Sequence, residues 1–435
     1  MSKINVSELV SKSKLSSFHI SIFLTSLFVI IFNGFNQSVY GIALPALMQD
    51  TGIAASVFGM IGTYTLYGML AGSLIFGMIA NKIGRPKALA LGVVLYCFGT
   101  GMFGFSNSVA EFSIYRIIAG VGLAGVVPVA IPIVSEYSPA KNRSTLSSYV
   151  TAGVPIGAII TPLIGMALLP KLGWRPMYLL GFIPLVMLIF IFAIIPESME
   201  RLVGKGDNGK IRKVLRKAAP EFTSGSNDEY VTDNEGAGKS KSSVKELFSD
   251  GRARNTVLFW IAFICSMFFT YGLQTWLPNM MIQAGFPISN SMIFMFVYGA
   301  GSVPSIGFSG VLASKLGYKK SIVIFTLLAA VMLALMSFRP GGMLMYVMLF
   351  LVGSGMYGAT ALFYTYIAVS YPNAVRSAGV GFAAAAGRLG GSFGPMVGGL
   401  LASKGASLTV NFLVFAAAMA VVSLCISITK ERIAG

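Results

Sequence analysis

The two halves of this sequence repeat one another at a constant offset of 233 positions, which is the separation of Gly77 from Gly310. The segment 77–87 returns as 310–320, and Pro45 returns as Pro278. The other recurring residues also suit turns, hinges and close packing: Pro139 with Pro372, Arg143 with Arg376, Gly157 with Gly390, Pro162 with Pro395, and Gly165 with Gly398. Such a pattern is expected when one membrane unit has been duplicated with its backbone geometry retained. Positions found in both halves are therefore scaffold candidates, whereas a polar residue in only one half is a better candidate for chemistry.

Composition predicts a membrane protein. Of the 435 residues, 55% are hydrophobic and 11% are charged, whereas a soluble domain carries about 25% charged residues. A helix needs roughly 20 apolar residues to cross a bilayer. Twelve segments qualify: 18–47, 53–80, 88–106, 111–137, 144–169, 175–196, 254–284, 289–314, 318–338, 342–371, 376–403 and 407–429. We therefore expect an all-α integral membrane protein with twelve transmembrane helices in two pseudo-symmetric six-helix bundles.

The spans divide the chain into five regions: a cytoplasmic N-terminus at 1–17, a six-helix bundle at 18–196, a cytoplasmic linker at 197–253, a second bundle at 254–430, and a cytoplasmic C-terminus at 431–435. The linker is rich in both acidic and basic residues and poor in apolar ones, which is typical of a connecting segment. Within it, 211–217 could lie as a short amphipathic helix against anionic headgroups, or could be a solvated run of charges.

The net charge of +17 has a one-sided distribution. The termini and the loops on their side carry most of the lysine and arginine, whereas the opposite loops hold only Lys171, Arg175, Arg339 and Lys404. This asymmetry follows the positive-inside rule and places both termini in the cytoplasm. It also removes nucleic acid as the reason for the positive charge. The multi-pass protein is expected to have the lipid bilayer as its surroundings and to be a monomer.

Two arginines lie inside expected spans, without a counterpart at the repeat offset, where Pro155 and Leu349 stand. Counting 1.5 Å per residue from its helix start, Arg388 lies roughly 18 Å deep and Arg116 roughly 8 Å deep. A buried guanidinium costs several kcal/mol unless it is paired. A substrate carboxylate would be a fitting bidentate partner. The alternatives are backbone carbonyls at kinked helices, or a gating role for Arg116.

Two motifs resemble the major facilitator superfamily. The glycine-rich loops at 77–87 and 310–320 are similar to its signature loop, and Arg116 to Pro139, with Gly120, Gly122 and Gly125, is similar to its fourth-helix motif. The resemblance implies the major facilitator fold and a transporter rather than an enzyme. It also implies a gating latch on the cytoplasmic side. The residues assigned to that latch are Asn81, Lys82, Arg85, Lys87, Glu136, Arg143, Lys315 and Arg376.

A narrower resemblance rests on the segments 33–45, 271–278 and 371–395. They are similar to the aromatic acid:proton symporter family, bacterial inner-membrane importers of benzoate-type carboxylates and of muconate. The resemblance implies proton-coupled import of a small organic carboxylate. The expected substrate contacts are Arg388, Arg116, Asn33, Asn36, Gln274 and the aromatic residues Trp276, Tyr64, Tyr298 and Tyr357, although such aromatics also pack against neighbours or lipid.

The chain departs from that family at its first helix. The family pattern is Asp-Gly-x-Asp, whereas this chain has the amides Asn33 and Asn36. All fifteen acids lie in loops, termini or helix ends, and the single histidine, His19, lies at the mouth of the first helix. Proton relays usually need an intramembrane acid or histidine. Proton symport, a proton-independent facilitator, an anion exchanger and an exporter of anionic or neutral compounds therefore remain open, as does a dicarboxylate substrate.

Other classes of function fit less well. The sequence has no buried acid pair, no nucleophile–base arrangement and no metal-binding spacing, so neither a membrane enzyme nor a metal or other cofactor is expected. Cys97, Cys265 and Cys425 lie in apolar segments and are interpreted as packing residues. A non-transporting sensor would need an output domain, and the linker has too little apolar content to form one.

Overall fold

The computed structural model describes residues 3–221, 229–232, 244–249, 251–372 and 375–430, and the expected C-terminal tail at 431–435 lies outside them. The first half contains α2 (Ser17–Thr51), α3 (Ala55–Ile83), α4 (Arg85–Phe103), α5 (Val109–Glu136), α6 (Ala140–Thr151), α7 (Gly153–Leu172), α8 (Arg175–Leu179), the 3-10 helix η1 (Leu180–Val186) and α9 (Met187–Ile194). The second half contains α12 (Ala253–Gln283), α13 (Ile288–Ala300), α14 (Ser302–Leu316), α15 (Tyr318–Met336), α16 (Met343–Ser370), α17 (Arg376–Ser403) and α18 (Leu408–Ser427).

Eleven helices in the described ranges are long and apolar enough to cross a membrane, counting α6–α7, α8–α9 and α13–α14 as one each. Each coincides with an expected span to within a few residues, which confirms the all-α membrane fold. The expected span at 376–403 is the exception: it forms α17 at those bounds, but its glycines and Arg388 make it less apolar than the rest. Packing explains how α17 tolerates this composition, because it lies between α12 of its own half and α3 of the other.

Three of the spans are broken, each four residues before a proline. Proline lacks an N–H and its ring clashes with the carbonyl four residues earlier, which favours a break there, although the prolines inside α2, α5, α12 and α17 leave those helices continuous. Helix α6 ends at Thr151, four residues before Pro155, and α13 ends at Ala300, four residues before Pro304. In the sixth span, the helix tightens into η1 from Leu180, four residues before Pro184.

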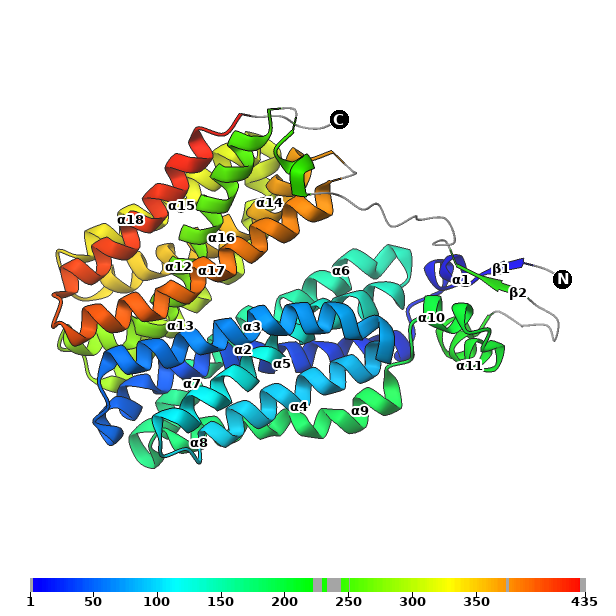
Figure 1. Cartoon of the computed structure of the whole chain (residues 1–435), viewed down its shortest axis with the longest axis horizontal. Helices are drawn as coiled ribbons and strands as arrows, with labels where there is room; N and C mark the ends of the chain where they lie inside the picture. Colours follow the sequence, from blue (N-terminus) through cyan, green and yellow to red (C-terminus); the bar gives the residue numbers. More distant parts are fainter. Residues whose placement is uncertain (1–2, 222–228, 233–243, 250, 373–374, 431–435) are drawn as a thin grey trace.

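The two halves touch at the end of the molecule that is remote from both termini. Thr63 Oγ1 of α3 donates to the Ser392 carbonyl oxygen of α17 at 2.7 Å, and Gln274 Nε2 of α12 donates to Ser38 Oγ of α2 at 3.0 Å. A Cβ on Gly41 would overlap the Gln274 carbonyl oxygen, so the absence of a side chain permits this approach. Figure 1 shows the halves converging near α13 and diverging toward the end that carries both termini.

The N-terminus and the linker form a small folded module beside the first half. It contains α1 (Val6–Lys12), α10 (Met199–Gly204), α11 (Asn208–Ala218) and a parallel pair of strands, β1 (Lys3–Asn5) and β2 (Glu229–Val231). The short 3-10 helix η2 (Val244–Leu247), further along the linker, packs instead on the second half, where the Leu247 carbonyl oxygen accepts from Thr256 Oγ1 of α12. Asp207 caps α11 by accepting from the Lys210 backbone N–H, and its hydrogen bond with the Lys210 side chain holds the pKa of its carboxyl below the usual range. The linker is therefore more structured than the sequence suggested.

Helix α11 corrects the expectation for 211–217. The segment is an amphipathic helix, but Ile211, Leu215 and Ala218 are buried in one apolar cluster with Val6 and Val10 of α1. Because this apolar face packs on protein, it is not available to lipid headgroups, and the segment is not a freely solvated charge run either.

Replacing Leu215 with aspartate is expected to open this module, because a buried unpaired charge costs several kcal/mol. Limited trypsin digestion of the purified protein should then cut the 205–217 region faster than in the parent. Lys213, which is exposed on the same helix, provides the matched control as Lys213→Arg, which keeps the trypsin site. Equal protection of the Leu215 variant and the control would contradict the packing of α11 on α1.

Candidate functional site

Arg388 of α17 is half-buried and has no hydrogen bond or ion pair with any described residue. Its charge interacts with the hydroxyls of Tyr271 on α12 and Tyr364 on α16. Gly391, one turn further along α17, allows the Tyr271 ring to pack closely, because a Cβ there would lie 2.8 Å from it. The structure thus places an arginine without an anionic partner beside two tyrosine hydroxyls, about 18 Å from the start of its helix.

Two of the tyrosines expected from the sequence, Tyr357 and Tyr298, are connected to Tyr271, Tyr298 by way of Tyr357. Tyr357 of α16 interacts with Tyr271, and the Tyr298 ring of α13 lies with its centroid 6.0 Å from that of Tyr357. Tyr298 also donates a hydrogen bond to Met356 Sδ at 3.0 Å. The sequence analysis did not select Tyr271, although it lies in the same 271–278 segment as Gln274. We call Arg388, Tyr271, Tyr357, Tyr298 and Tyr364 the Arg388 group.

A small cavity of about 20 Å³ lies between the two halves, lined by Arg116 and by Tyr271 of the Arg388 group. Gln37 and Tyr40 of α2, Thr65 of α3 and Arg116 of α5 line it from the first half, and Tyr271, Gln274 and Pro395 line it from the second. The Arg116 guanidinium lies over the Tyr40 ring at 4.4 Å from its centroid. We call this the Arg116 cavity. Tyr271 lines this cavity and also belongs to the Arg388 group.

The first-helix amides lie in the packed interior. Asn33 Nδ2 donates to the Leu123 carbonyl oxygen at 3.0 Å, and Asn33 Oδ1 accepts from Gln37 at 2.7 Å. Asn36 Nδ2 donates to the Phe32 carbonyl oxygen of its own helix at 2.7 Å, which leaves its buried Oδ1 without a partner. Asn33 reaches the Arg116 cavity only through Gln37, a residue that the sequence analysis missed.

Two expected substrate contacts lie elsewhere. Trp276 is fully buried between helices, and its Nε1 donates to the Pro395 carbonyl oxygen at 2.8 Å. Gly398 lies against its ring so closely that a Cβ there would overlap it. Tyr64 is half-buried and packs against Tyr67, which is exposed. In this conformation Trp276 serves helix packing, and neither ring lines the Arg116 cavity.

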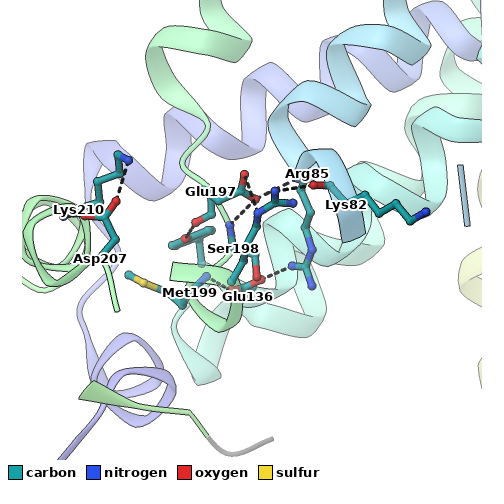
Figure 2. A network of polar contacts seen from close by, with 10 residues as sticks. Lys82, Arg85, Glu136, Glu197, Ser198, Met199, Asp207 and Lys210 are labelled. Carbon is teal, nitrogen blue, oxygen red and sulfur yellow. Dashed lines mark hydrogen bonds and ion pairs between the residues drawn. The ribbon is translucent and has the colours of Figure 1, made fainter. Parts of the chain in front are cut away.

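At the end that carries the termini, a charge cluster holds the loop between α3 and α4 (Figure 2). Arg85 forms an ion pair with Glu136 at the end of α5, and its backbone N–H donates to Glu197 Oε1 at 3.1 Å. Arg201 donates to the Lys82 carbonyl oxygen at 2.6 Å. Gly84 has φ of 96° and a Cβ there would overlap the Glu197 carboxylate, so glycine is required at this turn. Glu197 and Arg201 were not selected from the sequence.

The remaining latch candidates do not join the two halves in this conformation. Arg143 donates a long bond to the Ser138 carbonyl oxygen at 3.4 Å, and Lys82 and Lys87 have exposed side chains. Lys315 is exposed and Arg376 is half-buried, and neither has an ion pair with a described residue. The Asn81 side chain lies outside the described residues. Among the described residues, every ion pair of the cluster is therefore internal to the first half and the linker.

Comparison with known proteins agrees with the fold and with both resemblances. The sequence model described as Major Facilitator Superfamily matches residues 26–395 and 295–432. The chain belongs to the Major Facilitator Superfamily, and it is a multi-pass membrane transporter. Within the superfamily its relatives match the aromatic acid:proton symporter family, as the segments around Asn33, Tyr271 and Arg388 indicated.

Two relatives illustrate this similarity. The chain is 34% identical to the benzoate transport protein of Acinetobacter baylyi, over 94% of this chain and 89% of that protein. It is 27% identical to the 4-hydroxybenzoate transporter PcaK of the same organism, over 97% and 94%. Among solved structures, the inward-open xylose transporter XylE of E. coli has a TM-score of 0.71 at 19% identity, covering 94% of this chain and 96% of that one.

Proposed function

We propose that this protein imports a small aromatic carboxylate across a bacterial cytoplasmic membrane by alternating access of its two halves. The observation that carries the proposal is Arg388, a half-buried cation with no anionic partner among the described residues, placed among tyrosines. A planar guanidinium binds a carboxylate through two parallel hydrogen bonds. The tyrosine rings supply aromatic faces for a benzoate-type ring. The relatives named for benzoate and 4-hydroxybenzoate transport support the same substrate class.

The place of Arg388 along α17 supports alternating access. The contacts of α17 with the other half at Ser392, Pro395 and Gly399 lie on the sealed side of Arg388. On the other side, toward Arg376, the two halves diverge (Figure 1). With the termini in the cytoplasm, as the positive-inside rule favours, this conformation is inward-facing. The substrate site would then be reached from the cytoplasm here, and from outside after the halves rock about it.

The latch assignment follows from the same geometry. In the inward-facing conformation the cytoplasmic ends lie apart, so a latch between the halves cannot be formed. We propose that the charge cluster of Arg85, Glu136 and Glu197 stays assembled in both conformations and that Lys315 and Arg376 approach the first half only in the outward-facing one.

The proton needs a carrier other than an acidic side chain at mid-membrane, because all fifteen acidic residues lie in loops, termini or helix ends. We propose that any proton travels with the substrate carboxyl group.

Uptake into proteoliposomes tests the proposed function. Purified protein would be reconstituted and supplied with labelled benzoate, 4-hydroxybenzoate or cis,cis-muconate, with and without an inward proton gradient, against protein-free liposomes. Accumulation that needs the gradient would support symport, and saturable equilibration without accumulation would support the facilitator or exchanger. Absence of saturable flux for all three acids would overturn the proposed substrate class.

Replacing Asn36 with aspartate tests the role of the first-helix amides. A carboxylate at this buried position would repel an anionic substrate when charged and could carry a proton when neutral. We expect the affinity for benzoate at alkaline pH to fall about tenfold or more, and uptake to become steeper in its pH dependence. Uptake measured over a range of pH in the same proteoliposomes checks this. An unchanged affinity and pH profile would show that the amides do not tune charge at the site.

A further inference from the structure

Arg116 combines nearly complete burial with unused hydrogen-bond donors. Arg116 is only 4% exposed, and its Nε and Nη1 have no hydrogen-bond partner among the described residues. Thr65, which is 5% exposed and lines the same cavity, has a hydroxyl that is also without a partner. The hydroxyl of Tyr178, near enough to interact with Arg116, is likewise unpaired. Buried polar groups are almost always hydrogen-bonded, so this concentration of donors needs an explanation.

The charge of Arg116 is not balanced by the protein around it. None of the described residues that line the Arg116 cavity is acidic. The contact with the Tyr40 ring attracts the cation but supplies neither a counter-charge nor an acceptor for its N–H groups, so the desolvation of the charge stays largely uncompensated. A water molecule would satisfy donors but would leave the charge uncompensated. An anion would do both.

The volume of the cavity limits what that anion can be. A cavity of about 20 Å³ exceeds the roughly 10–15 Å³ that one water molecule requires, but it is far too small for an aromatic ring. A single-atom anion slightly larger than water is the size that fits. Arg116 and Thr65 both line this cavity and both carry donors without a partner, so such an ion would lie beside them.

We propose that Arg116 and Thr65 form a binding site for one halide ion, chloride in the cell, that is distinct from the carboxylate site at Arg388. Both halves build the cavity, since Tyr271, Gln274 and Pro395 close it from the second half. It therefore exists only while this end of the transporter is sealed. A ligand that binds one conformation stabilises that conformation, so chloride holds the transporter in the inward-facing state.

Thermal unfolding of the purified full-length protein tests the site, with sodium chloride replaced by sodium gluconate at constant ionic strength. We expect a saturable rise in Tm with chloride, roughly 2–4 °C at saturation, and a similar rise with bromide. The rise should be absent in Arg116→Gln and reduced in Thr65→Val, which keeps the side-chain shape without the hydroxyl. Arg388→Gln is the matched control, because it removes the other intramembrane arginine and should keep the full halide effect.

A crystal grown in bromide supplies a second measurement, since anomalous scattering locates the ion directly. A peak beside Arg116 and Thr65 is expected, and Thr65→Val serves here if Arg116→Gln does not fold. A Tm that is equal in chloride and gluconate, or a halide effect that persists in Thr65→Val and Arg116→Gln, would overturn the halide site. If benzoate rather than halide raises Tm and only Arg116 variants lose the effect, Arg116 is a substrate contact instead, and carboxylate transport itself stands.

Discussion

Replacing Arg388 with lysine is expected to weaken carboxylate binding by about 1–3 kcal/mol, which is roughly 5- to 150-fold in KM for uptake. Lysine keeps the positive charge but loses the planar fork that holds both carboxylate oxygens. Arg388 has no other hydrogen-bond partner among the described residues, so little of the loss should come from broken protein contacts. Initial rates of benzoate uptake in proteoliposomes give the comparison.

The exposed Arg339 provides the matched control, because Arg339→Lys makes the same chemical change far from the site. Its KM should equal that of the parent protein. Arg388→Gln removes the charge as well and should lose uptake altogether. If Arg388→Lys transports with the parent KM, the arginine acts as a point charge or as a structural residue, and the bidentate contact is wrong.

Adding a single methyl group at Gly41 is expected to disturb closure of the end remote from the termini. The new Cβ would overlap the Gln274 carbonyl oxygen of the other half. At Gly59 it would lie 2.7 Å from the Pro395 carbonyl oxygen and 3.1 Å from the Gly399 Cα. Overpacking at such contacts costs about 1–3 kcal/mol. That cost falls only on the conformation in which this end is sealed, so the population should shift toward the opposite conformation.

The shift can be measured with a reporter at the sealed contact. Ser38 is completely buried there and hydrogen-bonded to Gln274, so Ser38→Cys in a background without the native cysteines should resist a membrane-impermeant maleimide. In Gly41→Ala and Gly59→Ala the same cysteine should label faster, and uptake should fall about 5- to 150-fold. Gly307→Ala is the control, because a Cβ there meets nothing within 4 Å. Equal labelling in all backgrounds would show that the glycines do not govern closure.

The sequence predicted the helical elements well for a physical reason. An unbroken apolar run of this length has few alternatives to a membrane helix, so eleven spans were found to within a few residues. The breaks in three of them were not predicted, because prolines inside α2, α5, α12 and α17 leave those helices continuous. The span at 376–403 was also predicted, at the bounds of α17, and tertiary structure explains only how its glycines and arginine are tolerated, through burial between α12 and α3.

Contacts between distant segments were beyond the sequence. Tyr40, Thr65 and Arg116 come from three helices, and nothing local marks them as neighbours. The placement of Trp276 against Gly398, away from the cavity, depends on how α12 and α17 cross. The sequence also did not indicate which conformation the structure would show, because the same helices form the inward-facing and the outward-facing states. The expected latch residues Lys315 and Arg376 therefore lack partners in the first half in this state.

The pairing of β1 with β2 has a consequence for biosynthesis. Residues 3–5 are synthesised before the six spans of the first half, but their partners at 229–231 follow only after all six have been made. The N-terminal strand must therefore remain unpaired throughout the insertion of those helices, because its contact is one of the most distant along this half of the chain. The module of α1, α11 and the strand pair can therefore close only after the first half has been synthesised.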